Sequence, residues 1–132
     1  MNESAPDSDL SSGPLADSIN EKAQRDLAVG TTWLVVLATI AKASSPVHGY
    51  EIARSLSHAS PHGVGVKHGT LYPILRTMEA EGLVTSTLVP STQGPARRCF
   101  TITPAGRDTL GGWIASWRSV RGQVDELLGG IP

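Results

Sequence analysis

The sequence predicts a mainly helical chain of the α+β class, in which several helices flank one short β-hairpin. Three observations support this class. Apolar residues recur at helical spacing over much of positions 20–82 and again over 104–131. Apolar and polar residues alternate, as they do in strands, over 83–89 and 97–103. The segment between these two stretches contains two prolines and a glycine, which is typical of a loop.

The nearly neutral composition hides an uneven distribution of charge. The 132 residues include 11 Lys and Arg and 12 Asp and Glu. Positions 1–20 hold four of the acids and no base, so the rest of the chain has 8 acids against 11 bases and a net charge of +3. This mildly basic remainder permits a nucleic-acid partner.

Neither secretion nor membrane insertion is expected. The acidic start lacks the apolar core of a signal peptide. The uncharged and mostly apolar stretch 27–41 has 15 residues, fewer than the roughly 20 that a membrane-spanning helix needs. The single cysteine, Cys99, excludes an internal disulfide and fits a reducing cytoplasm, where we expect the protein to act.

The first segments are predicted to be a disordered acidic tail over 1–20 and a helix from about 20 to 44. The tail is rich in Ser, Pro, Gly and Asp and has no periodic apolar pattern. The helix is apolar on two faces, so its own domain and a second subunit are expected to cover it from two directions. Pro46 follows two serines and ends it.

Two shorter helices should follow, over 49–58 and 67–82, with a loop over 59–66 between them. Pro73 is compatible with the first turn of the second of these helices, because amides there have no intrahelical acceptor. The core-facing residues of this helix are expected to be Leu71, Ile74, Leu75 and Met78.

The final helix is predicted to begin at Pro104, with Thr103 as its N-cap. Its apolar residues are spaced alternately by three and four, which is the heptad pattern of helices that pack together. They are Leu110, Trp113, Trp117, Val120, Val124, Leu127 and Ile131. This strict spacing favours self-association over folding back onto the same domain. The expected dimer interface comprises Trp33, Val36, Leu110, Trp113, Trp117, Val120, Val124 and Leu127.

The order helix, helix, helix, strand, loop, strand is that of a winged helix-turn-helix, here over 21–103, followed by a dimerisation helix over 104–132. Helix 67–82 would then enter the major groove of DNA, because free amides and the helix dipole at its start attract phosphate. Arg76 could read a guanine edge. The expected DNA contacts are Lys67, His68, Thr70, Tyr72, Pro73 and Arg76 on this helix, and Gln93, Gly94, Arg97 and Arg98 on the hairpin. Successive strand residues point to opposite faces, so only one of the two adjacent arginines is expected to face the groove, and which one is open.

Three strings also resemble the PadR family of bacterial transcriptional regulators. They are HGYEIARSL at 48–56, GTLYPILRTMEAEGLV at 69–84 and RRCFTITPAGRDTL at 97–110. The resemblance implies a dimeric repressor that binds a palindromic operator and pairs through its N-terminal and C-terminal helices. The single short C-terminal helix resembles a compact subfamily, some members of which bind flat aromatic compounds between the subunits.

Trp117 lies on the heptad stripe, so two copies could enclose a planar aromatic effector, with Trp33 lining the space and Arg121 steering an anion. The alternative is that the tryptophans only fill the core. No catalytic arrangement is present in the sequence, and the four histidines lack metal-ligand spacing, so we expect neither an enzyme nor a cofactor or metal. Two other functions stay open: a winged-helix protein-interaction module, and a drug-binding module without operator binding.

Overall fold

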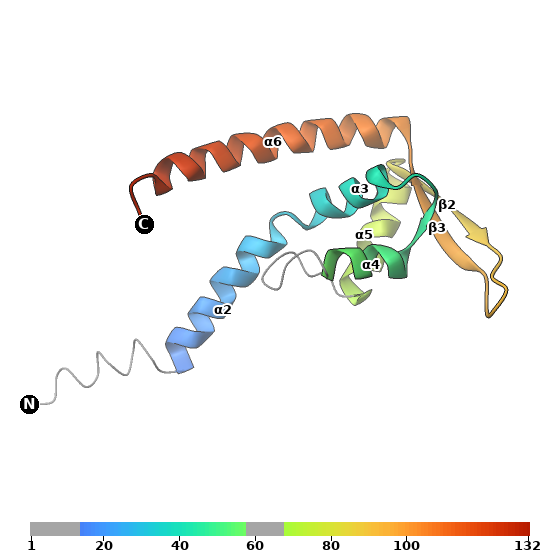
Figure 1. Ribbon diagram of the computed structural model, residues 1–132, viewed down its shortest axis with the longest axis horizontal. Coiled ribbons are helices and arrows are strands. Elements are labelled where there is room, and N and C mark those ends of the chain that lie inside the picture. The colour runs from blue at the N-terminus through green and yellow to red at the C-terminus, as the bar shows by residue number, and fades with distance from the viewer. Residues whose placement is uncertain (1–13, 58–67) are drawn as a thin grey trace, which may run out of the picture. The chain divides into compact units, whose positions relative to one another are not determined.

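The computed structural model describes residues 14–57 and 68–132, which belong to two compact units, Met1–Thr31 and Thr32–Pro132 (Figure 1). In the first unit, the described residues form helix α2 (Pro14–Val29) and the turn that follows it. The second unit contains the remaining elements. They are α3 (Thr32–Lys42), β1 (Val47–His48), α4 (Gly49–Ser57), α5 (His68–Ala80), β2 (Val84–Val89), β3 (Arg97–Ile102) and α6 (Pro104–Leu128). The predicted mainly helical class with one hairpin is confirmed.

The single helix predicted over about 20–44 is wrong, because the chain leaves the helical conformation at Gly30 and Thr31. Glycine is about 1 kcal/mol less favourable than alanine inside a helix, and the threonine beside it is a weak helix former. The predicted tail also extends too far, since residues 14–20 are helical. Pro14 suits the start of a helix because its φ is already fixed near the helical value. Residues 1–13 of that tail lie outside the described part of the chain, as does the loop predicted over 59–66.

The sheet has three antiparallel strands in the order β1-β3-β2. The hairpin strands were predicted, and β1 was not, because two residues are too few to display alternation. In the register, His48 lies opposite Cys99, and Val84 lies opposite Ile102. The short strand β1 therefore holds His48 beside the start of β3 and leads directly into α4.

The core of the second unit lies between α3, α4, α5, the sheet and the first turns of α6. The four predicted core residues of α5 are buried, as are the inward residues of the neighbouring helices. The largest fully buried side chains are Leu37, Ile52, Leu71, Leu75, Met78, Val36 and Val84. Burial of this face of α5 leaves its opposite face toward solvent.

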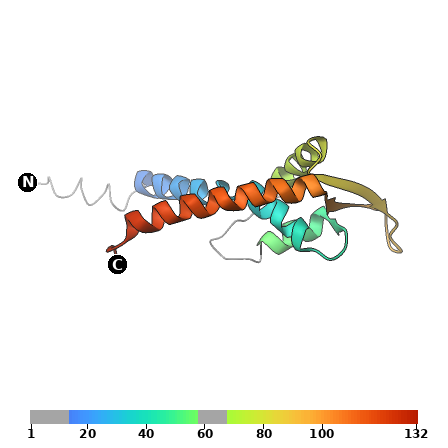
Figure 2. The same ribbon diagram turned by 90° about the horizontal axis from the view of Figure 1, so that it is seen from above.

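Thr103 fixes the direction of α6, and its predicted role as N-cap is confirmed. The Gly106 amide donates to Thr103 Oγ1 over 2.9 Å, and Thr103 Oγ1 donates to the Gly82 carbonyl over 2.6 Å. Gly106 lies directly on the backbone of Leu83, where a Cβ would collide with the carbonyl oxygen. In both views, α6 starts beside the end of β3 and runs away from the hairpin (Figures 1 and 2).

Candidate nucleic-acid interface

The outward face of α5 carries the polar and aromatic residues that the sequence analysis assigned to DNA. Thr70, Tyr72, Pro73 and Arg76 are all exposed, and the Tyr72 side chain is 44% exposed. Thr77 Oγ1 donates to the Pro73 carbonyl over 3.0 Å, so this oxygen has a partner although the proline lies inside the helix. A duplex can therefore reach this face without any unfolding. His68 is the first residue of α5, whereas Lys67 lies outside the described residues.

Tyr72 connects this face to the start of α4. A Cβ placed on Gly49 would lie 3.2 Å from Tyr72 Oη and 3.3 Å from its ring carbon Cζ, so the tyrosine lies closely against a backbone that has no side chain. Cβ contacts this short require the neighbouring atoms to move. Gly49 thus allows α4 and the outward face of α5 to approach each other at the edge of one groove.

This groove lies between β1, the start of α4, Tyr72 of α5 and the start of β3. Its charged groups are three arginines and one carboxylate, together with a histidine that can become positive. The lining residues are His48, Gly49, Tyr50, Glu51, Arg54, Tyr72, Ala96, Arg97 and Arg98. An excess of positive charge in a concave surface attracts anions. We call this surface the arginine groove.

Several groove residues were missed by the sequence analysis, notably His48, Tyr50 and Arg54. They belong to the string HGYEIARSL, most of which was predicted as the helix over 49–58 that precedes the DNA-reading helix. The signal that could have located them was the apolar-polar pair Val47–His48 before a helix start. It became informative only once β1 was seen to pair with β3.

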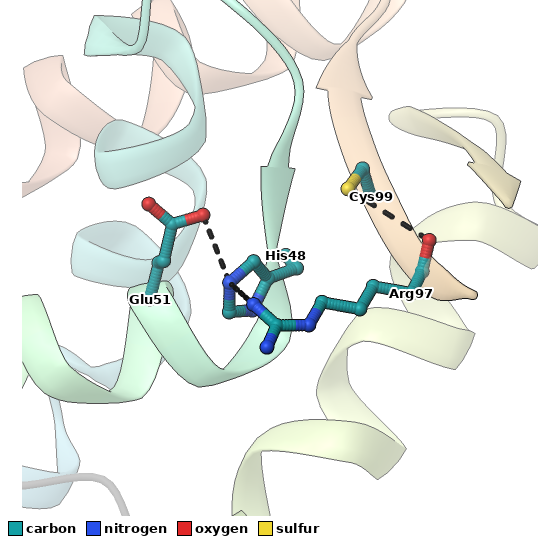
Figure 3. Close-up of polar contacts among 4 residues, drawn as sticks. All are labelled: His48, Glu51, Arg97 and Cys99. Carbon is teal, nitrogen blue, oxygen red and sulfur yellow. Dashed lines mark hydrogen bonds and ion pairs between the residues drawn. The ribbon is translucent and has the colours of Figure 1, made fainter. Parts of the chain in front are cut away.

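The two adjacent arginines at the start of β3 have different partners. Arg97 Nη1 lies 3.1 Å from His48 Nε2, and this histidine nitrogen also lies 3.1 Å from Glu51 Oε1 (Figure 3). Arg98 Nη1 instead donates to Ser86 Oγ over 2.9 Å. Both arginines line the arginine groove of the protein. Which of them faces the groove of DNA stays a prediction. An arginine side chain is long enough to reach the groove from either face of the strand.

The hydrogen bond of Arg98 is one of two consecutive hydrogen bonds that connect β3, through β2, to α5. Ser86 Oγ, which accepts from Arg98, donates in turn to Glu79 Oε2 over 2.6 Å. Glu79 lies near the end of α5, and Ser86 lies in the middle of β2. The orientation of the hairpin relative to α5 is therefore fixed by hydrogen bonds as well as by the buried core.

The hairpin loop is accessible to a partner. Gln93 and Gly94 are both exposed, and the Gln93 amide donates to Ser91 Oγ over 3.3 Å. Gly94 has a φ of 132°, a backbone conformation that residues other than glycine rarely adopt. In both views this loop is the tip of the hairpin, away from α3, α4 and α5 (Figures 1 and 2).

Part of the expected dimer interface is exposed, and part of it is core. Val36 has no exposed surface and Leu110 is buried, so their assignment to an interface is wrong: the interior of the second unit already takes up both side chains. Trp113 is half-buried against the same core. By contrast, the apolar residues that follow on α6, and Trp33 on α3, remain exposed. The exposed members are Trp33, Trp117, Val120, Val124 and Leu127.

Arg121, the expected anion-steering residue, forms an ion pair along α6. Its Nε lies 3.5 Å from Asp125 Oδ2, and both side chains are about two-thirds exposed. Exposed pairs of this kind contribute little, so Arg121 remains able to change partner. Across residues 14–57 and 68–132, no three potential metal ligands lie close together. None of the helices in these ranges has the length and apolar character to span a membrane.

Comparison with known proteins identifies the family. The family model for PadR-like transcriptional regulators matches residues 36–112. Transcriptional regulator Rv3488 of Mycobacterium tuberculosis is 40% identical over 88 residues, which is 67% of this chain and 76% of that protein.

Similarity to solved structures supports the same family. A PadR family transcriptional regulator from Eggerthella lenta superposes with a TM-score of 0.75 at 28% identity, over 88% of this chain and 97% of that one. A PadR-like transcriptional regulator from Bacillus cereus gives 0.66 at 33% identity, over 80% and 98%. These matches confirm the winged-helix fold and point to a regulator of transcription rather than an enzyme. The chain belongs to the PadR-like family of transcriptional regulators.

Proposed function

We propose that the protein is a homodimeric repressor that binds operator DNA through α5 and the arginine groove and is released by a small effector. The observation that carries this proposal is the exposed outward face of α5, where Thr70, Tyr72 and Arg76 adjoin a groove containing three arginines. The helix supplies groups that can contact base edges, and the arginines supply charge for the backbone. As a DNA-binding protein with a single cysteine, it would act in the cytoplasm.

The homodimer is supported by the apolar stripe on α6. Every residue from 115 to 132 is exposed in the single chain, although the stripe continues through Trp117, Val120 and Val124. An exposed row of apolar residues at heptad spacing is covered when a second helix packs against it. Pairing of two chains would present two copies of α5, which can read half-sites about 34–36 Å apart, or a multiple of that distance.

The effector proposal rests on the exposed indoles of Trp33 and Trp117, which lie on two helices that contact each other. Between paired subunits, such rings could stack on a planar aromatic compound. An effector of this kind would release the operator only if it bound more tightly to an arrangement of the two reading heads that does not fit DNA. Arg121 would favour an anionic compound by leaving Asp125.

The test begins with selection of a duplex from a random-sequence library by the purified protein. Binding of the selected duplex is then measured for the wild type and for Arg76→Ala. We expect Arg76→Ala to weaken binding by about 1–3 kcal/mol and to relax the preference for one base pair. Arg107→Ala, which removes the same charge from an exposed position on α6 outside the groove, should bind as the wild type does.

Two results would favour the alternative functions. Failure to select any duplex, with a folded protein, would indicate a protein-interaction module. Quenching of tryptophan fluorescence by planar dyes, without any effect on DNA affinity, would indicate a module whose role is to bind drugs. Equal affinity of Arg76→Ala and the wild type for every duplex would exclude α5 as the reading helix.

A further inference from the structure

One nitrogen atom in the arginine groove has two partners that make opposite demands. His48 Nε2 lies 3.1 Å from Arg97 Nη1 and 3.1 Å from Glu51 Oε1 (Figure 3). A guanidinium only donates hydrogen bonds, so a bond to Arg97 requires a lone pair on Nε2. An ionised carboxylate only accepts, so a bond to Glu51 requires a hydrogen on the same nitrogen. His48 can satisfy one partner at a time.

The tautomer and the protonation of the ring together decide between them, because a hydrogen on Nε2, in the neutral Nε2–H tautomer or in the protonated ring, favours Glu51. The neutral ring with its hydrogen on Nδ1 leaves the Nε2 lone pair for Arg97. The protonated ring has a hydrogen on both nitrogens, so it donates to Glu51 and can no longer accept from Arg97. It also places a second positive charge next to the guanidinium. Gain of a proton therefore separates Arg97 from His48 and leaves the guanidinium without this partner at the edge of the groove.

The surroundings of His48 allow this exchange to take place at the surface. Its side chain is 15% exposed, whereas that of Glu51 is 54% exposed. The other titratable and charged groups around it come from three elements. They are Tyr50 and Arg54 on α4, Tyr72 on α5, and Arg97, Arg98 and Cys99 on β3. Tyr50 stacks on the imidazole, with ring centroids 6.1 Å apart.

We propose that the arginine groove holds a backbone phosphate of bound duplex DNA, and that protonation of His48 releases Arg97 to contact it. The proposal rests on the proposed DNA-binding function. A guanidinium released at the edge of a positively charged groove forms paired hydrogen bonds with phosphate oxygens. Glu51, occupied by the protonated ring, is then partly neutralised and repels the phosphate less. DNA binding should therefore take up a proton at His48.

Coupling between proton uptake and DNA binding fixes the direction in which DNA affinity changes with pH. If the complex binds more protons than the free protein, affinity rises as the pH falls. The measurement lies within the interval of about pH 5 to pH 8, in which histidine side chains in general change charge. One proton taken up gives at most about a tenfold change in affinity for each pH unit.

The decisive experiment measures the affinity of the selected duplex between about pH 8 and pH 6 at constant ionic strength. For the wild type and for Arg107→Ala, we expect affinity to rise several-fold as the pH falls. For Arg97→Ala, binding should be weaker throughout and the rise should be lost, because there is no guanidinium to release. Retention of the full rise in Arg97→Ala would overturn the proposal, since any histidine near DNA could then account for it.

A second measurement needs no variant. Nitrogen NMR of the imidazole in the wild-type protein reports directly which of the two ring nitrogens carries a hydrogen, so it distinguishes the protonated ring from the neutral Nε2–H tautomer. At neutral pH, addition of the duplex should convert His48 Nε2 to the protonated form. An unchanged ring signal in a saturated complex would contradict the coupling.

Two further results distinguish failure of the proposed proton coupling from failure of the proposed DNA-binding function. Inorganic phosphate added at the concentration of the duplex should leave the ring unchanged, and a response equal to that of the duplex would assign the groove to a free anion instead. Absence of any selected duplex would refute the proposed function itself. A wild-type affinity that is tight but independent of pH would refute only the coupling.

Discussion

Arg97 and Arg98 are adjacent in the sequence but differ in their bonds, and this difference governs what each can do for DNA. Arg97 is bonded to a histidine at the edge of the groove, whereas Arg98 belongs to the chain through Ser86 to Glu79. Replacement of both by alanine should lower the salt dependence of DNA binding, because each phosphate contact contributes about 0.9 to the slope of log K against log salt.

The measurement is a salt titration of duplex binding, with Arg107→Ala as the control for loss of a charge outside the groove. A slope that is identical in the double variant and the wild type would remove the start of β3 from the interface. Among the single variants, Arg98→Ala should also disturb the hairpin, since the bond from β3 to Ser86 on β2 is lost, whereas the bond from Ser86 to Glu79 on α5 remains.

At the level of elements, the start of α6 depends on a glycine that lies directly on another backbone. A Cβ on Gly106 would collide with the Leu83 carbonyl, whereas a Cβ on Gly111, one turn further along α6, meets nothing within 4 Å. Gly106→Ala should therefore destabilise the protein, by about 1–3 kcal/mol or more, because backbone atoms must move. Gly111→Ala should stabilise it by about 0.5–1 kcal/mol, because alanine favours the helix.

Urea denaturation of the two variants checks this pair, and each one is the matched control of the other. Equal stability of Gly106→Ala and the wild type would show that α6 does not lie against Leu83 as described.

The N-cap of the same helix gives an independent prediction. Thr103 Oγ1 accepts from the Gly106 amide and donates to the Gly82 carbonyl. Thr103→Ala should cost about 1–2 kcal/mol of stability, whereas Thr103→Ser, which keeps the hydroxyl, should cost less. Thermal unfolding of both variants measures the difference, and a serine variant no better than the alanine variant would argue against the capping bond.

The elements also show which parts of the fold could be predicted from the sequence. The apolar face of α5, the hairpin and the cap at Thr103 were predicted because each depends on residues close in the chain. The break at Gly30 was missed, because continuous apolar character on both sides of it concealed a weak helix position. Strand β1 was missed because it exists only through its pairing with β3. For that reason His48 was not recognised as a site residue, and Val36 was assigned to an interface although it is core.

At the level of the whole molecule, the exposed stripe on α6 predicts the oligomeric state. Val124→Glu introduces a charge into this stripe and should convert a dimer to a monomer, because burial of an unpaired carboxylate between two helices is costly. Sedimentation of the variant measures the change. Ser119→Glu, which adds the same charge at an exposed position of α6 off the stripe, should stay dimeric. A wild-type chain that is monomeric at micromolar concentration would contradict the proposed dimer.

The proposed dimer matters for the proposed function, because one α5 alone would read only half of a palindromic site. Two chains paired through α6 would bring two outward faces of α5, each with its arginine groove, to the same side of one duplex. Their separation would then determine the spacing of the half-sites. The exposed tryptophans at the proposed pairing surface are where the proposed effector would change that separation.

Hydroxyl-radical footprinting of the selected duplex tests most directly whether paired chains read DNA through α5. We predict two protected segments related by a dyad, with centres about 10 base pairs or a multiple of that number apart, and loss of both in Val124→Glu at the same protein concentration. A single protected segment, or a footprint that is unchanged in a monomeric variant, would contradict the proposed mode of binding.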